Sequence, residues 1–124
     1  MRRTITLLIW TLVSLGIVAS ARATTIITPM IEKDSTGSAF RCFAVNAGKK
    51  PVDLTMELRN SLGAVFEDLG PFSVQPGAAL IIGTNEATFG YCVVEGEFPK
   101  RSLRVSLCTL PQGTVDCVGT VVGQ

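Results

Sequence analysis

The chain has 124 residues, with 11 Lys and Arg, 10 Asp and Glu and no His. This length, together with 47% apolar and 17% charged residues, indicates one globular domain rather than a disordered chain. The lack of His excludes Ser-His-Asp and Cys-His catalysis, His acid–base chemistry and the commonest zinc sites.

The N-terminal 23 residues have the three-part layout of a secretory signal. Arg2 and Arg3 form a short basic head, residues 5–20 are mostly apolar, and Ala21-Arg22-Ala23 is the small-x-small pattern that signal peptidase recognises. The apolar stretch is shorter than the roughly 18 residues expected of a membrane-spanning helix. We therefore predict a signal peptide over 1–23 that is cleaved after Ala23, with an uncleaved N-terminal anchor as the alternative.

Cleavage would leave residues 24–124 as a single domain with a negative net charge. Loss of Arg2, Arg3 and Arg22 leaves eight basic residues against ten acidic ones, which gives a net charge of −2. Nucleic acids and anionic membrane surfaces attract clustered positive charge. The balance therefore argues against nucleic acid, and we expect no membrane insertion after cleavage. The expected partner is an unidentified protein or glycan at the cell envelope.

Short β-strands are predicted along the whole of the mature chain. The clearest is 51–59, in which Val52, Leu54, Met56 and Leu58 alternate with polar residues, as in a half-buried strand. No window keeps a 3.6-residue period over the dozen or so residues that a helix needs. In chain order, the predicted strands are 25–31, 39–46, 51–59, 64–68, 78–83, 90–95, 101–109 and 115–122.

Turn-forming residues separate these strands. They are Asp34-Ser35-Thr36-Gly37, Asn46-Ala47-Gly48, Asn60-Ser61-Leu62-Gly63, Gly70-Pro71, Gln75-Pro76-Gly77 and Pro111-Gln112-Gly113. Strands this short at this spacing are typical of β-sandwiches and barrels. We predict an all-β fold, a two-sheet antiparallel sandwich of the immunoglobulin-like type.

All four cysteines lie after the predicted signal, and an even number in an exported chain indicates two disulfides. Their spacing does not match the C-x2-C pairs of zinc sites. A hairpin centred between Gln112 and Gly113, with a loop of two or four residues, would set Cys108 opposite Cys117. In strand 101–109 the alternation predicts that Cys108 faces away from the core.

The remaining two cysteines then pair with each other. The pairing of Cys92 with Cys108 is disfavoured, because a hairpin closing at 96–100 would set Cys92 opposite Arg104, about 13 Å from Cys108 along the strand. The prediction is Cys42 with Cys92 and Cys108 with Cys117.

Several motifs between residues 40 and 107 resemble a set of short exported bacterial β-sandwich proteins of unassigned activity. They are Cys42-x-x-x-Asn46-x-Gly48, strand 51–59 followed by Ser61-Leu62-Gly63, Pro76-Gly77, Gly90-Tyr91-Cys92 and Arg101-x-x-Arg104-Val105. The resemblance implies the fold and export, and it implies no chemistry. Antibody-type domains also carry a core Trp on the third strand, where this chain has Leu54 and Met56.

Two groups of acidic residues are weak candidates for chemistry. Glu67-Asp68 and Glu95-x-Glu97 could serve acid–base work on a glycoside, but charged residues of this kind are mostly solvated surface. The segment Glu32-x-Asp34-Ser35-Thr36-Gly37 has oxygen donors without the spacing of a calcium loop, and we interpret it as a turn. We therefore predict no catalytic residue, no metal and no cofactor.

A basic group is the best candidate for a binding surface. It comprises Lys49, Lys50, Phe98, Lys100 and Arg101, with Arg104 nearby. In an immunoglobulin-like order, the loops at 46–51 and 96–100 lie at the same end of the sandwich, and binding residues are often carried by such loops. The competing interpretation is that Phe98 folds inward as an apolar plug and the lysines only maintain solubility.

These features favour an exported, non-enzymatic domain, periplasmic or extracellular, that acts as a binding or structural component of the cell envelope or secreted fraction. A small carboxylate-dependent hydrolase is one alternative. It needs a cleft holding two carboxylates. A carbohydrate-binding module is another, and we would expect it to expose a row of aromatic side chains.

Overall fold

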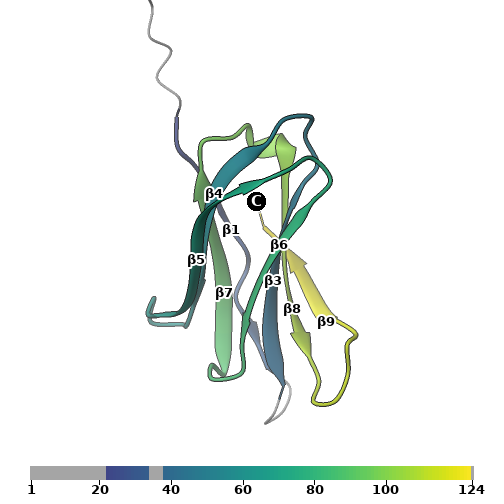
Figure 1. The fold of residues 1–124 in the computed structure, drawn as a ribbon. Helices are drawn as coiled ribbons and strands as arrows, with labels where there is room; N and C mark the ends of the chain where they lie inside the picture. The colour runs from purple at the N-terminus through teal and green to yellow at the C-terminus, as the bar shows by residue number, and fades with distance from the viewer. Residues whose placement is uncertain (1–21, 34–37, 124) are drawn as a thin grey trace, which may run out of the picture.

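The protein is all-β. A computed structural model describes residues 22–33 and 38–123, which form two antiparallel sheets packed face to face (Figure 1). The predicted sandwich is therefore confirmed. The predicted signal segment, apart from Arg22 and Ala23, and the predicted turn at 34–37 lie outside the described residues, as does most of the oxygen-rich loop considered for calcium.

The sheets contain nine strands within the described part of the chain. Sheet one has the order β1-β7-β4-β5, with β2 also paired to β7; sheet two has the order β6-β3-β8-β9. The elements are β1 (Thr24–Ile27), β2 (Ile31–Glu32), β3 (Ala39–Asn46), β4 (Val52–Arg59), β5 (Val65–Val74), β6 (Ala79–Thr84), β7 (Phe89–Gly96), the 3-10 helix η1 (Lys100–Ser102), β8 (Leu103–Leu110) and β9 (Val118–Val122).

Alternating side chains from both sheets make the core. Strands β3 and β4 bury every second residue, as the period of 2 predicts. The largest fully buried apolar side chains include Phe40, Leu54, Met56, Leu58 and Leu107, and they pack between the sheets. Burying a side chain of this size stabilises the fold by about 1.5–3 kcal/mol.

Strand β5 runs further than the sequence predicts. The predicted strand 64–68 was expected to end at a turn at Gly70-Pro71, but β5 continues to Val74. The Gly70–Pro71 peptide is cis, Gly70 has φ +115°, and the pairing with β4 shifts register beside it. Because β5 is an edge strand, a bulge can accommodate a proline that donates no ladder hydrogen bond.

The predicted hairpin at 96–100 is wrong. Strand β7 pairs with β4 and β1 in sheet one, whereas β8 pairs with β3 and β9 in sheet two. Helix η1 lies on the connection between the two sheets.

Both predicted disulfide pairs are present. Cys42 on β3 joins Cys92 on β7 across the two sheets, with a Cα–Cα distance of 6.1 Å, and Cys108 joins Cys117 with a Cα–Cα distance of 5.5 Å. Both members of the first pair are fully buried in the core. This pair therefore ties together layers that no backbone hydrogen bond joins at that position.

The register used to predict the second pair is wrong, although the pair itself is right. Leu107 lies opposite Val121 and Thr109 opposite Val118, with an irregularity between them, so Cys117 precedes β9 in a longer loop. Cys108 was expected to face away from the core. Its side chain is instead buried, with only 1% exposed, although it is not part of the cluster of apolar side chains packed between the two sheets.

Of the helical segments in the part of the chain that the structure describes, none is long and apolar enough to cross a membrane.

Candidate binding surface

The two loops that carry the predicted basic group meet at one end of the sandwich. The Ala47 N–H donates a hydrogen bond of 2.8 Å to the Ser102 carbonyl oxygen. Gly48 packs so closely on Ser102 that a Cβ at Gly48 would lie 2.9 Å from the Ser102 Cβ. Residues 47–51 also line one hollow together with Glu97 and Pro99, so the loops at 46–51 and 96–100 lie at the same end of the sandwich, as predicted.

A buried amide organises the first of these loops. The side chain of Asn46 is 0% exposed, and its Nδ2 donates hydrogen bonds of 2.8 Å to the carbonyl oxygens of both Lys50 and Val74. Its Oδ1 accepts a hydrogen bond of 2.9 Å from the Gly48 N–H. The bonds to Lys50 and Gly48 hold the loop backbone and the bond to Val74 ties it to the end of β5, so Asn46 sets the path along which Lys49 and Lys50 reach the surface.

The sequence analysis treated Asn46 only as a turn residue. An Asn that bonds the backbone two residues later is an Asx turn, and the Asn46-x-Gly48 spacing was its signal. The bonds to Lys50 and Val74 had no such signal, because Val74 is distant in sequence and joins the loop only through the fold.

The four cations of the predicted surface are exposed: Lys49, Lys50, Lys100 and Arg101. We call the end of the sandwich that these four residues define the cationic end. Phe98 does not share this surface. It is only 5% exposed and belongs to the core cluster, which is the apolar-plug interpretation. The prediction that Phe98 belongs to the binding surface is therefore wrong.

The cations border two neighbouring hollows rather than one. The first has a volume of about 670 Å³ and is lined by both loops, with Lys49, Lys50 and Arg101 as its cations and Glu97 as its single carboxylate. The second has a volume of about 520 Å³ and includes Lys100 and Arg104. Arg101 borders both hollows, so the cations of the predicted surface are shared between two neighbouring hollows.

Positive charge is concentrated at this end. Of the eight basic residues in 24–124, five border the two hollows: Lys49, Lys50, Lys100, Arg101 and Arg104. None of the five forms an ion pair among the described residues. The surface is therefore available to a negatively charged partner.

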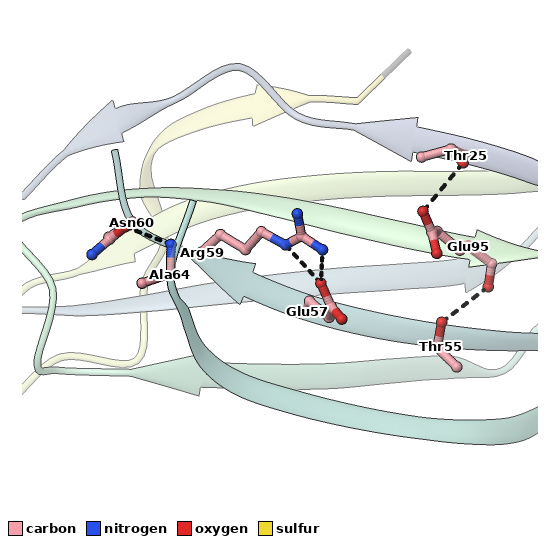
Figure 2. Close-up of polar contacts among 7 residues, drawn as sticks. All are labelled: Thr25, Thr55, Glu57, Arg59, Asn60, Ala64 and Glu95. Carbon is pink, nitrogen blue, oxygen red and sulfur yellow. Dashed lines mark hydrogen bonds and ion pairs between the residues drawn. The ribbon is translucent and has the colours of Figure 1, made fainter. Parts of the chain in front are cut away.

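The ion pair that the described residues do form is on β4 (Figure 2). There Arg59 Nε donates a hydrogen bond of 2.6 Å to Glu57 Oε2, and the guanidinium also contacts that oxygen through Nη2. The hydrogen bond from Arg59 to Glu57 raises the pKa of the guanidinium above its ordinary value. This pair neutralises a cation on the outer face of sheet one, away from the cationic end.

The candidate acid–base carboxylates are all exposed: Glu67, Asp68, Glu95 and Glu97. Glu95 lies between two strands, where its Oε1 accepts a long hydrogen bond of 3.4 Å from Thr25 and its backbone oxygen accepts one of 3.5 Å from Thr55 (Figure 2). Glu95, Glu97 and Asp53 border a hollow of about 430 Å³. Burial is the usual means of making a carboxyl a general acid, and these side chains lack it.

Neither a metal site nor a sugar-binding face is supported by the described residues. No group of three or more Asp, Glu, Cys or His side chains there could hold a metal ion. The exposed Phe72 and Phe89 lie at opposite ends of sheet one, since Phe72 is level with Leu54 and Gly96. They do not form the row of aromatic side chains that a sugar-binding face uses.

No family model, curated protein or solved structure matches this chain. The likeness to exported bacterial β-sandwich proteins therefore stays a prediction from sequence motifs. The geometry of the cationic end is what supports a function.

Proposed function

We propose that this protein is an exported, non-enzymatic domain of the immunoglobulin-like kind that binds a negatively charged partner through its cationic end. The partner is a protein or glycan of the cell envelope or of the secreted fraction. The observation that carries the proposal is the meeting of two loops, held by the Ala47–Ser102 hydrogen bond, around a hollow whose cations form no ion pair with any residue that the structure describes.

Electrostatics supports this assignment. Positive potential gathered at one end of a domain attracts and orients an anionic partner even when the net charge is slightly negative. The buried Asn46 network keeps the loop in place before any partner arrives, which lowers the entropy cost of binding. The disulfides support an oxidising compartment, in which such bonds persist.

Export with cleavage is part of the proposal and has its own test. Intact mass of the protein secreted from a bacterial host is expected to begin at Thr24, because Ala21-Arg22-Ala23 is the recognition pattern. Recovery of the whole chain in the membrane fraction would instead support the uncleaved anchor.

Charge reversal tests the binding surface. The Lys49→Glu/Lys50→Glu double variant is expected to weaken binding to polyglutamate or polygalacturonate by about tenfold at low salt, since each exposed ion pair contributes roughly 0.2–1 kcal/mol and reversal adds repulsion. Affinity is measured by calorimetry across a salt series. A partner bound through these lysines should also lose affinity as salt rises.

The matched control is Lys33→Glu, which reverses a cation at the opposite end of the sandwich, where Lys33 Nζ bonds the Asn85 carbonyl oxygen. Its affinity is expected to remain close to that of the wild type. Equal weakening by Lys33→Glu would show that overall charge, and not the cationic end, governs binding.

A further inference from the structure

The edge of sheet two at β6 lacks the features that protect the other sheet edges. Strand β6 pairs with β3 in an unbroken register from Ala79 to Thr84, and it contains neither a charged residue nor a proline. Within the described part of the chain, its backbone forms no hydrogen bond to any element other than β3. The N–H and C=O groups along its outer side are therefore open to a further strand.

The other edges are blunted in ways that natural sheets commonly use. Strands β1 and β2 contain only four and two residues. Strand β5 carries Glu67, Asp68 and Pro71, and its register against β4 shifts. Strand β9 has an irregular register against β8, with Gly119 at φ +61°. Among the edges that the structure describes, β6 alone is regular, uncharged and long enough to pair with an added strand.

Strand β5 leaves apolar surface uncovered beside this edge. It is the edge of sheet one on the same side of the sandwich, and it contacts β6 (Figure 1). Phe72 lies opposite Leu54, and Leu54 is almost fully buried on the inner face of the sheet. Opposed residues share a face, yet Phe72 is 49% exposed, and Leu69, the next inward residue, is only partly buried. Sheet two therefore ends before it covers the inner face of β5.

A hollow at one end of this gap joins the two strands. Its volume is about 360 Å³, and its lining includes Glu67 of β5, Gly83 of β6 and Glu86 of the turn after β6. The cation of the lining is Arg41, whose Nη1 donates a hydrogen bond of 3.1 Å to the Phe40 carbonyl oxygen of its own strand. Glu67 and Glu86 are exposed, and neither forms an ion pair with a described residue. This end of the gap therefore favours a positively charged group.

We propose that an extended segment of another protein binds in this gap and adds to β6 as an antiparallel strand. We call the place, bounded by the edge of β6 and the inner face of β5, the strand site. Backbone hydrogen bonds to β6 hold the segment, and its alternate apolar side chains cover Phe72 and Leu69. Because β6 has six residues, a segment of about six or seven residues spans it.

The charge at the hollow sets the orientation of the segment. Strand β6 ends at Thr84, which also lines the hollow that contains Glu67 and Glu86. The N-terminal end of an antiparallel segment lies beside the end of β6. A Lys or Arg at the N-terminal end of the segment therefore faces the two carboxylates, and the apolar part continues toward Phe72.

A free segment fits the strand site better than a second copy of this domain. Two copies that met β6 to β6 would bring their β5 edges toward each other, since β5 lies on the same side of the sandwich as β6. Each β5 carries Glu67 and Asp68, and like charges repel. A single extended segment brings no second sheet and meets no such repulsion.

The strand site goes beyond the proposed function, because it takes a partner of the opposite charge at a different place. Lys49 and Lys50 do not line its hollow, and Glu67 and Glu86 do not line the hollows of the cationic end. Either site can therefore fail without the other.

The test uses the mature domain and the synthetic peptide Lys-Thr-Val-Thr-Val-Thr-Val, with binding followed by calorimetry and by amide hydrogen exchange in NMR spectra. Saturable binding, slowed exchange of the β6 amides and shifts of the Phe72 ring signals are the expected results. The same peptide with Pro at its centre is expected to bind at least about tenfold more weakly, because proline removes a ladder donor. Glu in place of Lys is expected to weaken binding by about fivefold.

Two substitutions at exposed positions probe the edge and the apolar surface. Ile81 is 51% exposed on β6, and Ile81→Lys is expected to weaken peptide binding by about tenfold, because a charge on an edge strand opposes pairing. Phe72→Ala is expected to weaken it by about fivefold. The matched controls are Ile27→Lys on β1 and Phe89→Ala on β7, at positions 50% and 41% exposed. Both controls should bind the peptide like the wild type, and melting curves check that every variant is folded.

Equal binding of the peptide with Pro at its centre would overturn strand addition, and slowed exchange confined to β1 or β9 would overturn the place. Peptide binding that Ile81→Lys and Phe72→Ala both leave intact would also overturn the strand site. Self-association of the domain that Ile81→Lys abolishes, without peptide binding, would show that a second copy is the occupant. The Lys49→Glu/Lys50→Glu variant is expected to bind the peptide like the wild type, which keeps this test separate from that of the cationic end.

Discussion

Replacing Cys42 and Cys92 together by Ala is expected to lower the free energy of unfolding by about 4 kcal/mol or more. The disulfide closes a loop with a sequence separation of 50, for which chain entropy alone predicts about 4 kcal/mol. Both sulfurs are also fully buried between the sheets, so their loss leaves a gap in the core. A domain of this size has only about 5–15 kcal/mol in total, and the double variant should approach unfolding at 37 °C.

The Cys108→Ala/Cys117→Ala double variant is the comparison. Its loop has a sequence separation of 9, for which the same model predicts about 2.7 kcal/mol. Cys108 lies outside the core cluster, so the loss should mainly loosen the hairpin of β8 and β9. Urea melts of the two variants measure the ranking. Equal losses would contradict the loop-length argument, and peptide mapping without reduction checks the pairing directly.

Substitution of Asn46 by Ala is expected to cost about 2–4 kcal/mol of unfolding free energy. The change removes three hydrogen bonds of a fully buried side chain and leaves the Lys50 and Val74 carbonyl oxygens without that donor. Because those bonds hold the loop that carries Lys49 and Lys50, binding of anionic partners should weaken as well. Thermal and urea melts measure the first effect, and calorimetry with polyglutamate measures the second.

Asn60→Ala is the matched control for Asn46→Ala. Asn60 Oδ1 also accepts hydrogen bonds from backbone N–H groups of its own turn, at 2.9 Å from both Leu62 and Ala64, and Figure 2 shows the Ala64 bond. This turn is solvent-exposed and follows the end of β4 that lies away from the loop at 46–51. Its loss should cost about 1 kcal/mol or less, and binding of anionic partners should be unchanged. A cost equal to that of Asn46→Ala would argue that burial of the amide is unimportant.

Asn46→Asp adds a pH dependence whose sign follows from the surroundings. A carboxylate there would face the Lys50 and Val74 carbonyl oxygens in place of the amide donors, and burial would also disfavour its charge. Its pKa in the folded state would therefore lie above the unfolded value of about 3.9. The variant should be least destabilised below about pH 4 and increasingly so as pH rises. Melts at acidic and neutral pH measure the difference.

Local patterns predicted most of the strands and the fold class. The period of 2 in 51–59 matches β4 closely, because a half-buried strand must place apolar side chains on one face, and the predicted strand 39–46 has the same bounds as β3. Gly70-Pro71 misled the prediction for β5, because Gly-Pro is a common turn signal and only the edge position of β5 allows a bulged proline.

The disulfide prediction shows a right conclusion from a partly wrong premise. The hairpins assumed at 96–100 and about Gln112-Gly113 differ from the structure, in which β7 and β8 lie in different sheets and β9 begins only at Val118. The pairing survives because sequence proximity brings Cys108 and Cys117 together under either register. Elimination then leaves Cys42 and Cys92, whichever strands they occupy.

The sequence by itself determined an all-β chain, two disulfides and the location of the basic residues in two loops, because these depend on alternation, composition and spacing along the chain. The tertiary structure alone decided which side chains share a surface. Phe98 is adjacent to the cations in sequence but turns into the core, and Asn46 becomes the anchor of a loop through a carbonyl 28 residues away. The second hollow likewise depends on tertiary structure. Ile26 and Val122 lie near opposite ends of the described part of the chain, and only packing of the two sheets brings them to one lining.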